Sequence, residues 1–441
     1  MGPIRTGLNS QWKRSHRDSN SIVMFLYYFV GMLLFVLTAP FCLLLRKKRF
    51  SHRLALRLPE RSLEEGNIWV HALSVGEVIS AVALIEELSI RYPDASIVVS
   101  ASTSAGIDIA RNELEDKVKA VVTMPVDFLW SVRRIIRFVK PSLFVLVETD
   151  LWPGLLDQLS KKRVKSILVN GRVSPRTFRS YRRFPFFIKM MLQMMECCLM
   201  QTVLDRERLL RVCGASENIV TVGNIKFDRH WEPMDDDEHR KWLDMLGLDS
   251  DPLVWVAGSI HAGEAVTVLE TFRKLHAVHP NLVLILAPRR INDAEKFRRI
   301  ALDMGLRSLL RSELSEKTDP YDVLMLNTIG ELGRVYGLGH VCFVGGSLVP
   351  EGGHNPLEPA SFGSPVLFGP HMDDFLVLSE LLVEAGGGIR VRNEEELYRS
   401  LKSLLENNEI RKETGLRAKR FVENNQGALE RVLSYIDRVY T

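Results

Sequence analysis

The segment LFVLVETDLWP, residues Leu143–Pro153, decides the fold of the first half of the chain. It opens with a short apolar run, which is typical of a strand buried in a parallel sheet. The run ends at Glu148, and Pro153 suits the first turn of a following helix. A strand that leads through polar residues into a helix is the repeating unit of doubly wound α/β sheets.

The same alternation of strands and helices extends along the chain in both directions. A polar break, WEPMDDD at Trp231–Asp237, separates two series of apolar runs. We therefore predict an α/β protein with two doubly wound, Rossmann-like domains. The predicted parts are an N-terminal domain over 60–228, a linker over 229–250, a second domain over 251–425 and a C-terminal helix over 426–441. The predicted strands are Ile68–Val70, Ser96–Ser100, Ala120–Met124, Leu143–Glu148, Ser166–Asn170 and Cys197–Gln201, then Leu253–Ala257, Leu282–Ala287, Asp322–Leu326, His340–Val344, Pro365–Phe368 and Gly388–Val391.

Composition excludes several classes of protein. The chain has 441 residues, of which 46% are hydrophobic and 25% charged, so it is neither disordered nor a polytopic membrane protein. A net charge of +4 is too small to indicate nucleic-acid binding. The five cysteines lack the C-x-x-C spacing of a metal site, and we expect them to be buried thiols in a reducing compartment. The aspartates Asp235–Asp237 are interpreted as a linker and helix cap, and no metal ion is predicted.

The N-terminal region has the pattern of a membrane anchor. No charged residue occurs between Ser21 and Leu45, and as a helix this stretch would reach roughly 37 Å. We predict a tail over 1–20 and one transmembrane helix over 21–45. A cleaved signal peptide is the alternative, but the apolar run leads directly into Arg46-Lys47-Lys48-Arg49. The basic residues after the run favour a cytoplasmic location for the globular part.

Two acidic segments follow predicted strands of the first domain. HALSVGE (His71–Glu77) places Glu77 near a helix start, where the helix dipole favours a carboxylate. ETDLWP (Glu148–Pro153) brings Glu148 and Asp150 to the same edge of the sheet. A pair of carboxylates there can abstract a proton from a sugar hydroxyl and position that sugar. A purely structural role for Glu77, and helix capping by Asp150, remain the alternatives.

The second domain carries glycine-rich turns and fixed positive charge. AGSIHAGE (Ala257–Glu264) opens a helix whose free backbone N–H groups could cradle a phosphate. Ala287–Arg290 adds two arginines beside that turn, for which a solvated surface pair is the alternative. TIGEL (Thr328–Leu332) could present backbone edges to a planar base, or could simply begin a helix. GGS (Gly345–Ser347) and GGHNPLEP (Gly352–Pro359) place Glu358 in a first helical turn, where it can accept hydrogen bonds from ribose. Neither G-x-G-x-x-G nor G-x-x-x-x-G-K-[ST] occurs, which argues against dinucleotide oxidoreductases and P-loop nucleotide hydrolases. A nucleotide-sugar site is consistent with the segments that are present.

Together these segments resemble the Kdo (3-deoxy-D-manno-octulosonic acid) transferases of lipopolysaccharide assembly, which have the GT-B glycosyltransferase fold. The similarity runs from about Trp69 to Phe375 and also includes NGRVS (Asn170–Ser174) and GNIKFD (Gly223–Asp228). Three departures concern the acceptor side: Asp150 stands where the family usually has Glu, Gly154 where Asn is common, and Ser100–Gly106 replaces a threonine-rich run.

The resemblance implies two domains that face a cleft. It also implies transfer of Kdo from CMP-Kdo to a lipid A precursor (lipid IVA), with inversion and without metal or cofactor, at the cytoplasmic side of a bacterial inner membrane. Glu77 would be the general base, and Glu148 would arrange a sugar. Arg172 and Lys226 would meet anionic groups. Substrate would also contact Ser259 and His261, and CMP would be held by Pro288, Arg289, Ile329, Gly330, Glu331, Leu332, Gly353, Asn355 and Glu358.

Two alternative functions are compatible with these motifs, and one segment has the pattern of a membrane-contact surface. A GT-B transferase that uses a UDP-sugar is the enzymatic alternative, and an anchored nucleotide-binding scaffold is the non-enzymatic one. The segment Arg176–Lys189 interleaves basic and aromatic residues, a pattern that suits an anionic membrane surface. An ordinary helix with one solvated face would carry the same pattern.

Overall fold

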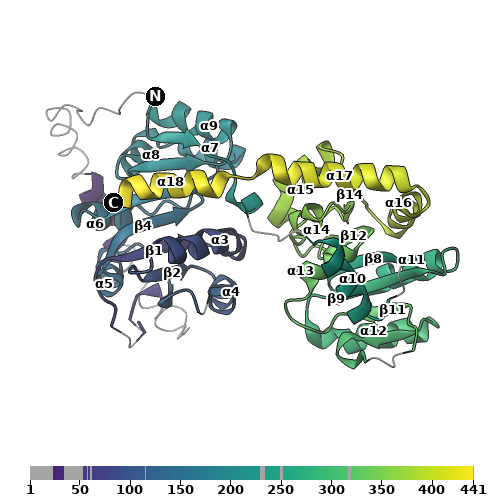
Figure 1. Cartoon of the computed structure of the whole chain (residues 1–441). Helices are drawn as coiled ribbons and strands as arrows, with labels where there is room; N and C mark the ends of the chain where they lie inside the picture. The colour runs from purple at the N-terminus through teal and green to yellow at the C-terminus, as the bar shows by residue number, and fades with distance from the viewer. Residues whose placement is uncertain are drawn as a thin grey trace. The chain divides into compact units, whose positions relative to one another are not determined.

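The computed structural model describes residues 23–33, 53–56, 58–59, 62–114, 116–228, 234–248, 252–315 and 319–440. The chain divides into unit 1, Met1–Arg229 with Gln426–Thr441, and unit 2, His230–Asn425. Over the described residues, each unit contains a seven-stranded sheet whose neighbouring strands are parallel (Figure 1). Two parallel-sheet, Rossmann-like domains are therefore confirmed.

The sheet of unit 1 has the strand order β3-β2-β1-β4-β5-β6-β7. Successive residues of β1 point to opposite faces, as strand geometry requires. Ile68 and Val70 pack with α3 in one hydrophobic cluster, whereas Trp69 packs with α5 in the other. The elements are β1 Asn67–Ala72, α3 Val75–Arg91, β2 Ile97–Ala101, α4 Ser104–Leu114, β3 Ala120–Thr123, α5 Leu129–Val139, β4 Pro141–Val147, α6 Pro153–Lys161, β5 Lys165–Gly171, α7 Pro175–Tyr181, α8 Pro185–Leu192, β6 Cys197–Met200, α9 Val203–Cys213, β7 Ile219–Thr221 and η1 Ile225–Asp228.

The C-terminal helix α18, Ala428–Tyr440, belongs to unit 1 rather than forming a separate tail (Figure 1). Its buried residues Val432, Leu433 and Ile436 complete the cluster that covers α3. The Asp228 carboxylate accepts hydrogen bonds from the backbone N–H groups at the start of the helix, including Leu429 N at 2.8 Å. The last residues of the chain therefore help to cover the first domain's core.

The sheet of unit 2 has the strand order β10-β11-β9-β8-β12-β13-β14. Asp235 caps α10 by accepting from Glu238 N at 2.7 Å, which confirms the predicted cap. The elements are α10 Asp236–Met245, β8 Leu253–Ile260, α11 Ala265–His276, β9 Leu282–Pro288, η2 Ile291–Asp293, α12 Ala294–Asp303, β10 Ser308–Leu310, η3 Arg311–Glu313, β11 Val323–Met325, α13 Leu332–Val335, η4 Tyr336–Leu338, β12 Val341–Val344, α14 Leu357–Ser361, β13 Val366–Phe368, η5 Asp373–Phe375, α15 Leu376–Glu384, β14 Gly388–Arg390, α16 Glu394–Glu406 and α17 Asn408–Asn425.

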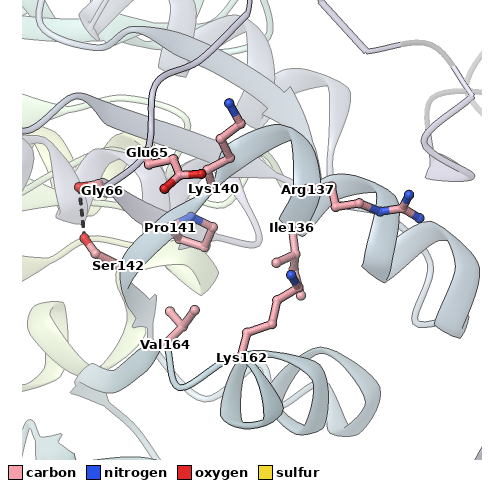
Figure 2. Close-up of a pocket in the computed structure, with 9 residues that line it drawn as sticks. All are labelled: Glu65, Gly66, Ile136, Arg137, Lys140, Pro141, Ser142, Lys162 and Val164. Carbon is pink, nitrogen blue, oxygen red and sulfur yellow. Dashed lines mark hydrogen bonds between the residues drawn. The ribbon is translucent and has the colours of Figure 1, made fainter.

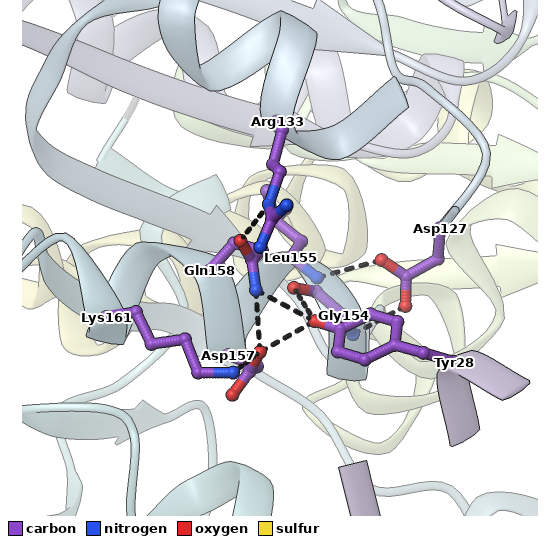
Figure 3. A network of polar contacts seen from close by, with 8 residues as sticks. All are labelled: Tyr28, Asp127, Arg133, Gly154, Leu155, Asp157, Gln158 and Lys161. Carbon is purple, nitrogen blue, oxygen red and sulfur yellow. Dashed lines mark hydrogen bonds and ion pairs between the residues drawn. The ribbon is translucent and has the colours of Figure 1, made fainter. Parts of the chain in front are cut away.

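Residues 23–33 of the predicted anchor form a helix, which is hydrogen-bonded to other parts of unit 1 (Figure 3). Tyr27 Oη donates to Asp127 Oδ2 at 2.7 Å, and Tyr28 Oη donates to Asp157 Oδ2 at 2.7 Å. In the part of the chain that the structure describes, no helix is long and apolar enough to cross a bilayer. Residues 21–22 and 34–45 of the predicted span, and the predicted tail over 1–20, lie outside the described residues.

The cysteines that the structure describes are free and buried, as predicted: Cys197, Cys198, Cys213 and Cys342. Cys42 lies outside the described residues.

Candidate active site

Glu77 lies where β1 ends and α3 begins. It sits in the first turn of α3, and its Oε2 accepts a hydrogen bond from Leu73 N at 2.5 Å. This bond folds the side chain back against the turn that follows the strand. The predicted position of Glu77 at the carboxyl end of the sheet is confirmed.

The environment of Glu77 favours its protonated form. Burial raises the pKa of the Glu77 carboxyl to about 8, and the negative charge of Glu148 adds to this rise. The bond from Leu73 N and the positive charge of Lys226 act in the opposite direction. A carboxyl group with a pKa close to neutral pH is suited to take up and release a proton during a reaction.

Glu148 and Lys226 form an ion pair beside Glu77. Lys226 Nζ lies 3.3 Å from Glu148 Oε1, and each side chain is 17% exposed. Glu148 follows the last residue of β4 and has a φ of 60°, a left-handed conformation that is uncommon for a residue with a side chain. Such strain is frequent at functional sites. The structure thus brings together three residues that the sequence predicts for this site.

Asp150 does not cap α6, so that interpretation of the sequence is wrong. Its Oδ2 accepts from Trp152 Nε1 at 2.6 Å and lies 3.6 Å from His71 Nε2. Asp127, which follows β3, instead accepts from Gly154 N and Leu155 N at the start of α6, at 2.7 and 2.8 Å (Figure 3). Asp150 therefore remains with the catalytic candidates at the end of β4.

The motifs NGRVS and GNIKFD contact this site through backbone groups of Arg172 and Ile225. The Thr149 hydroxyl donates to the carbonyl of Arg172, which follows β5 and is half-buried. Asn170, with a φ of 57°, accepts from Ile225 N at 3.2 Å, beside Lys226. The segments NGRVS and GNIKFD therefore support the positions of Glu148 and its lysine partner.

Unit 2 has a pocket of about 490 Å³ at the carboxyl ends of its strands. Pro288 ends β9, and the next two residues, Arg289 and Arg290, are exposed. A site of this size with fixed positive charge suits a phosphorylated nucleoside. The described lining residues are Ser259, Pro288, Arg289, Arg290, Ile291, Asn292, Thr328, Ile329 and Leu332.

The predicted residues Gly330 and Glu331 lie in the same loop as Ile329. Gly330 has a φ of 87°, and Glu331 accepts hydrogen bonds from Arg311 at 3.0 Å and from the Thr328 hydroxyl. These bonds hold the loop that forms one wall of the pocket. Glu331 therefore anchors the loop through its own side chain.

The predicted phosphate cradle at AGSIHAGE is wrong in one respect, because His261 N is not free. It donates to Glu264 Oε2 at 3.0 Å. The same buried carboxylate accepts from Gly346 N at 2.6 Å, Ser347 N at 3.0 Å and Leu348 N at 2.8 Å. Both glycine-rich segments thus direct backbone N–H groups at a carboxylate of the protein. Motif spacing alone did not reveal this role of Glu264.

His261 of AGSIHAGE and His354 of GGHNPLEP form a pair. His261 Nε2 lies 3.0 Å from His354 Nε2, and the rings stack with centroids 5.3 Å apart. Burial, together with the positive charge of Arg289, lowers the pKa of His354 to about 3. His354 is therefore neutral and shares one hydrogen bond with His261.

The remaining predicted residues surround the start of α14. Gly353 has a φ of 73°, and Asn355 Oδ1 accepts from Leu357 N at 3.1 Å. A Cβ atom at Gly333 would lie 3.0 Å from Glu358 Oε1. Glu358 therefore lies close to the start of α13, next to Leu332 of the pocket wall.

A second pocket, of about 470 Å³, lies at the amino-terminal edge of the unit 1 sheet, opposite the edge that carries Glu77 and Glu148 (Figure 2). It contains none of the predicted site residues. Its described lining residues are Glu65, Gly66, Ile136, Arg137, Lys140, Pro141, Ser142, Lys162 and Val164.

Comparisons with known proteins identify the family. The family model described as 3-deoxy-D-manno-octulosonic-acid transferase (kdotransferase) matches residues 48–229. A 3-deoxy-D-manno-octulosonic acid transferase from Haemophilus influenzae is 32% identical over 427 residues, which cover 94% of this chain and 98% of the relative. This chain belongs to the Kdo transferase family. A Kdo transferase from Aquifex aeolicus is 30% identical over 349 residues, 79% of this chain and 89% of its own length.

Solved structures agree on the fold of this Kdo transferase family member. A putative UDP-N-acetylglucosamine 2-epimerase from Listeria monocytogenes matches with a TM-score of 0.54 and 15% identity, over 85% of this chain and 96% of its own. MurG from Acinetobacter baumannii matches with a TM-score of 0.52 and 12% identity, over 85% and 100%. At these identities the likeness concerns the GT-B-like fold alone. The family model and the curated relatives confirm the resemblance noted in the sequence and the assignment as a glycosyltransferase.

Proposed function

We propose that the protein transfers Kdo from CMP-Kdo to a lipid A precursor, lipid IVA, with inversion at the anomeric carbon. The observation that carries the proposal is the buried Glu77 carboxyl beside the Glu148–Lys226 pair, in a member of the Kdo transferase family. The pocket of unit 2, with its two arginines, supports a nucleotide-linked donor.

In this mechanism the Glu77 carboxylate takes the proton of the acceptor hydroxyl as the hydroxyl oxygen attacks the anomeric carbon of Kdo. The bond from that carbon to the phosphate oxygen breaks, and CMP leaves with the bonding electrons. One displacement on one face of the sugar inverts the configuration. Arg289 and Arg290 stabilise the charge that develops on the leaving phosphate.

Loss of Arg289 is expected to weaken donor binding. We expect Arg289→Ala to raise the Kd for CMP roughly 10- to 100-fold, because a charge-assisted bond to phosphate is lost. Calorimetric titration of CMP measures the change. Arg399→Ala, an exposed arginine on α16, is the control and should leave the Kd unchanged. An Arg289 variant that binds CMP as tightly as the control contradicts the assignment.

The direct test of the reaction uses the purified protein, CMP-Kdo and a tetraacylated lipid A precursor. The lipid should gain the mass of one or more Kdo residues. A transferase that uses a UDP-sugar would bind UDP in preference to CMP and leave this lipid unchanged. A nucleotide-binding scaffold would bind CMP and transfer nothing.

We also propose a single-pass protein of the bacterial inner membrane whose catalytic part is cytoplasmic. Tyr27, in the described part of the predicted anchor, has its ring centroid 5.9 Å from that of Phe187 on α8. The segment Arg176–Lys189, which includes Phe187, exposes Arg182, Arg183 and Phe184, and the Phe184 side chain is 67% exposed. A membrane that holds the anchor would lie close to these side chains, which suits an anionic lipid surface.

Charge reversal tests this membrane contact. In lipid nanodiscs that contain the acceptor, we expect faster transfer with anionic than with zwitterionic lipids. Arg182→Glu combined with Arg183→Glu should lower the rate in anionic nanodiscs about tenfold and have little effect in zwitterionic ones. The control is Lys412→Glu with Arg420→Glu on α17, which should behave like the wild type. An equal loss in both lipids would contradict a membrane contact.

A further inference from the structure

We propose that Glu264 is a positioning residue for donor binding, an assignment that rests on the proposed function. No part of Glu264 is exposed. Among the described residues, four backbone N–H groups donate to its carboxylate, from His261 and from the consecutive residues Gly346, Ser347 and Leu348. One side chain therefore joins two loops that are more than 80 residues apart in sequence.

The backbones of the two loops approach each other so closely that no side chain fits between them at Gly345. A Cβ atom at Gly345 would lie 2.4 Å from the carbonyl oxygen of Ser259, a distance that atoms do not tolerate. Ser259 itself has a φ of 57°. Because backbone faces backbone here, the free N–H groups need an acceptor from elsewhere, and a buried carboxylate satisfies all four.

One of the two segments that Glu264 joins borders the nucleotide pocket. The described lining of the pocket includes Ser259 but not Glu264. The loops also carry the histidine pair, for which Gly346 leaves room: a Cβ atom there would lie 3.1 Å from the His354 ring and 3.3 Å from the His261 ring. Glu264 thus acts on the donor through residues that border the pocket.

A matched pair of variants separates positioning from stability. Glu264→Gln replaces one acceptor oxygen by an NH₂ group that faces N–H donors. Asp322→Asn makes the same change at a 7% exposed carboxylate that accepts from Arg307 N at 2.8 Å. Asp322 precedes β11, so it lies at the opposite edge of the unit 2 sheet from the pocket.

In the full-length protein both variants are expected to lower Tm. Only Glu264→Gln should raise the Kd for CMP and the KM for CMP-Kdo, about tenfold or more, with an unchanged KM for the lipid acceptor. Glu264→Asp keeps the carboxylate and should recover part of the affinity. If Glu264→Gln lowers Tm but binds CMP as tightly as Asp322→Asn, the assignment is overturned.

Amide hydrogen exchange separates this assignment from the proposed function. The amides of residues 346–348 should exchange faster in Glu264→Gln and not in Asp322→Asn. If the wild type binds no CMP, the proposed function fails, and the exchange rates still test whether Glu264 holds the loop. Unchanged exchange in Glu264→Gln would overturn the positioning role.

Discussion

Replacement of Glu77 by glutamine is expected to reduce Kdo transfer by roughly 10²- to 10⁴-fold, the usual contribution of a general base. Glutamine has the same size and can still accept the bond from Leu73 N. CMP binding should stay within about twofold of wild type, because Glu77 lies in unit 1 and the nucleotide pocket in unit 2. Single-turnover transfer and CMP titration measure the two quantities.

Thermal stability provides the control for this variant. The pKa of Glu77 is raised from 4.5 to about 8, so its contribution to stability is full below pH 4.5 and is lost as the pH rises through 8. Glutamine mimics the neutral acid, so Glu77→Gln should melt a few degrees higher than wild type at pH 9 and at a similar temperature at pH 4. Retention of near-normal transfer by this well-folded variant would contradict the role of base.

Loss of Lys226 is expected to have the second-largest effect. Lys226→Ala leaves Glu148 without its partner at 3.3 Å and removes a positive charge that lowers the pKa of Glu77. The pKa of Glu77 should therefore rise further, and transfer at pH 7 should fall roughly 10- to 100-fold. Raising the pH should recover part of the loss, which a series of rate measurements from pH 6 to 10 would detect.

The matched control is Lys162→Ala, which removes an exposed lysine at the opposite edge of the same sheet (Figure 2). It should transfer Kdo at the wild-type rate with the wild-type pH profile. If Lys226→Ala loses activity by the same factor at every pH, Lys226 does not act through the charge state of Glu77.

Much of the fold was predictable because strands of a parallel sheet are continuous apolar runs. Each run that was predicted as a strand overlaps an observed one. The predicted strands do not include β7 and β10, which are three-residue strands at the edges of their sheets. The surface that α18 covers was not predictable either, because the pattern of an amphipathic helix shows that one face is buried but not what that face packs against.

The position of the candidate site was predictable for a related reason. In a parallel sheet the residues that follow each strand collect at one edge, so Glu77 and Glu148 were expected at the same edge. The structure makes them neighbours because β1 and β4 are adjacent strands. Contacts between distant segments could not be predicted in this way. Asp127 caps α6 from 27 residues upstream, and Glu264 binds Gly346 across 82 residues. Neither lies in a local pattern that distinguishes it from other acids at helix starts.

The pH dependence of transfer by the wild-type protein tests the role of Glu77 most directly. The rate at low acceptor concentration, which reports kcat/KM for the lipid, should rise about tenfold per pH unit and level off near pH 8. Glu77→Gln should lack this acidic limb in its residual activity. A wild-type profile that is flat between pH 5.5 and 9, or an acidic limb that persists in Glu77→Gln, would contradict the account.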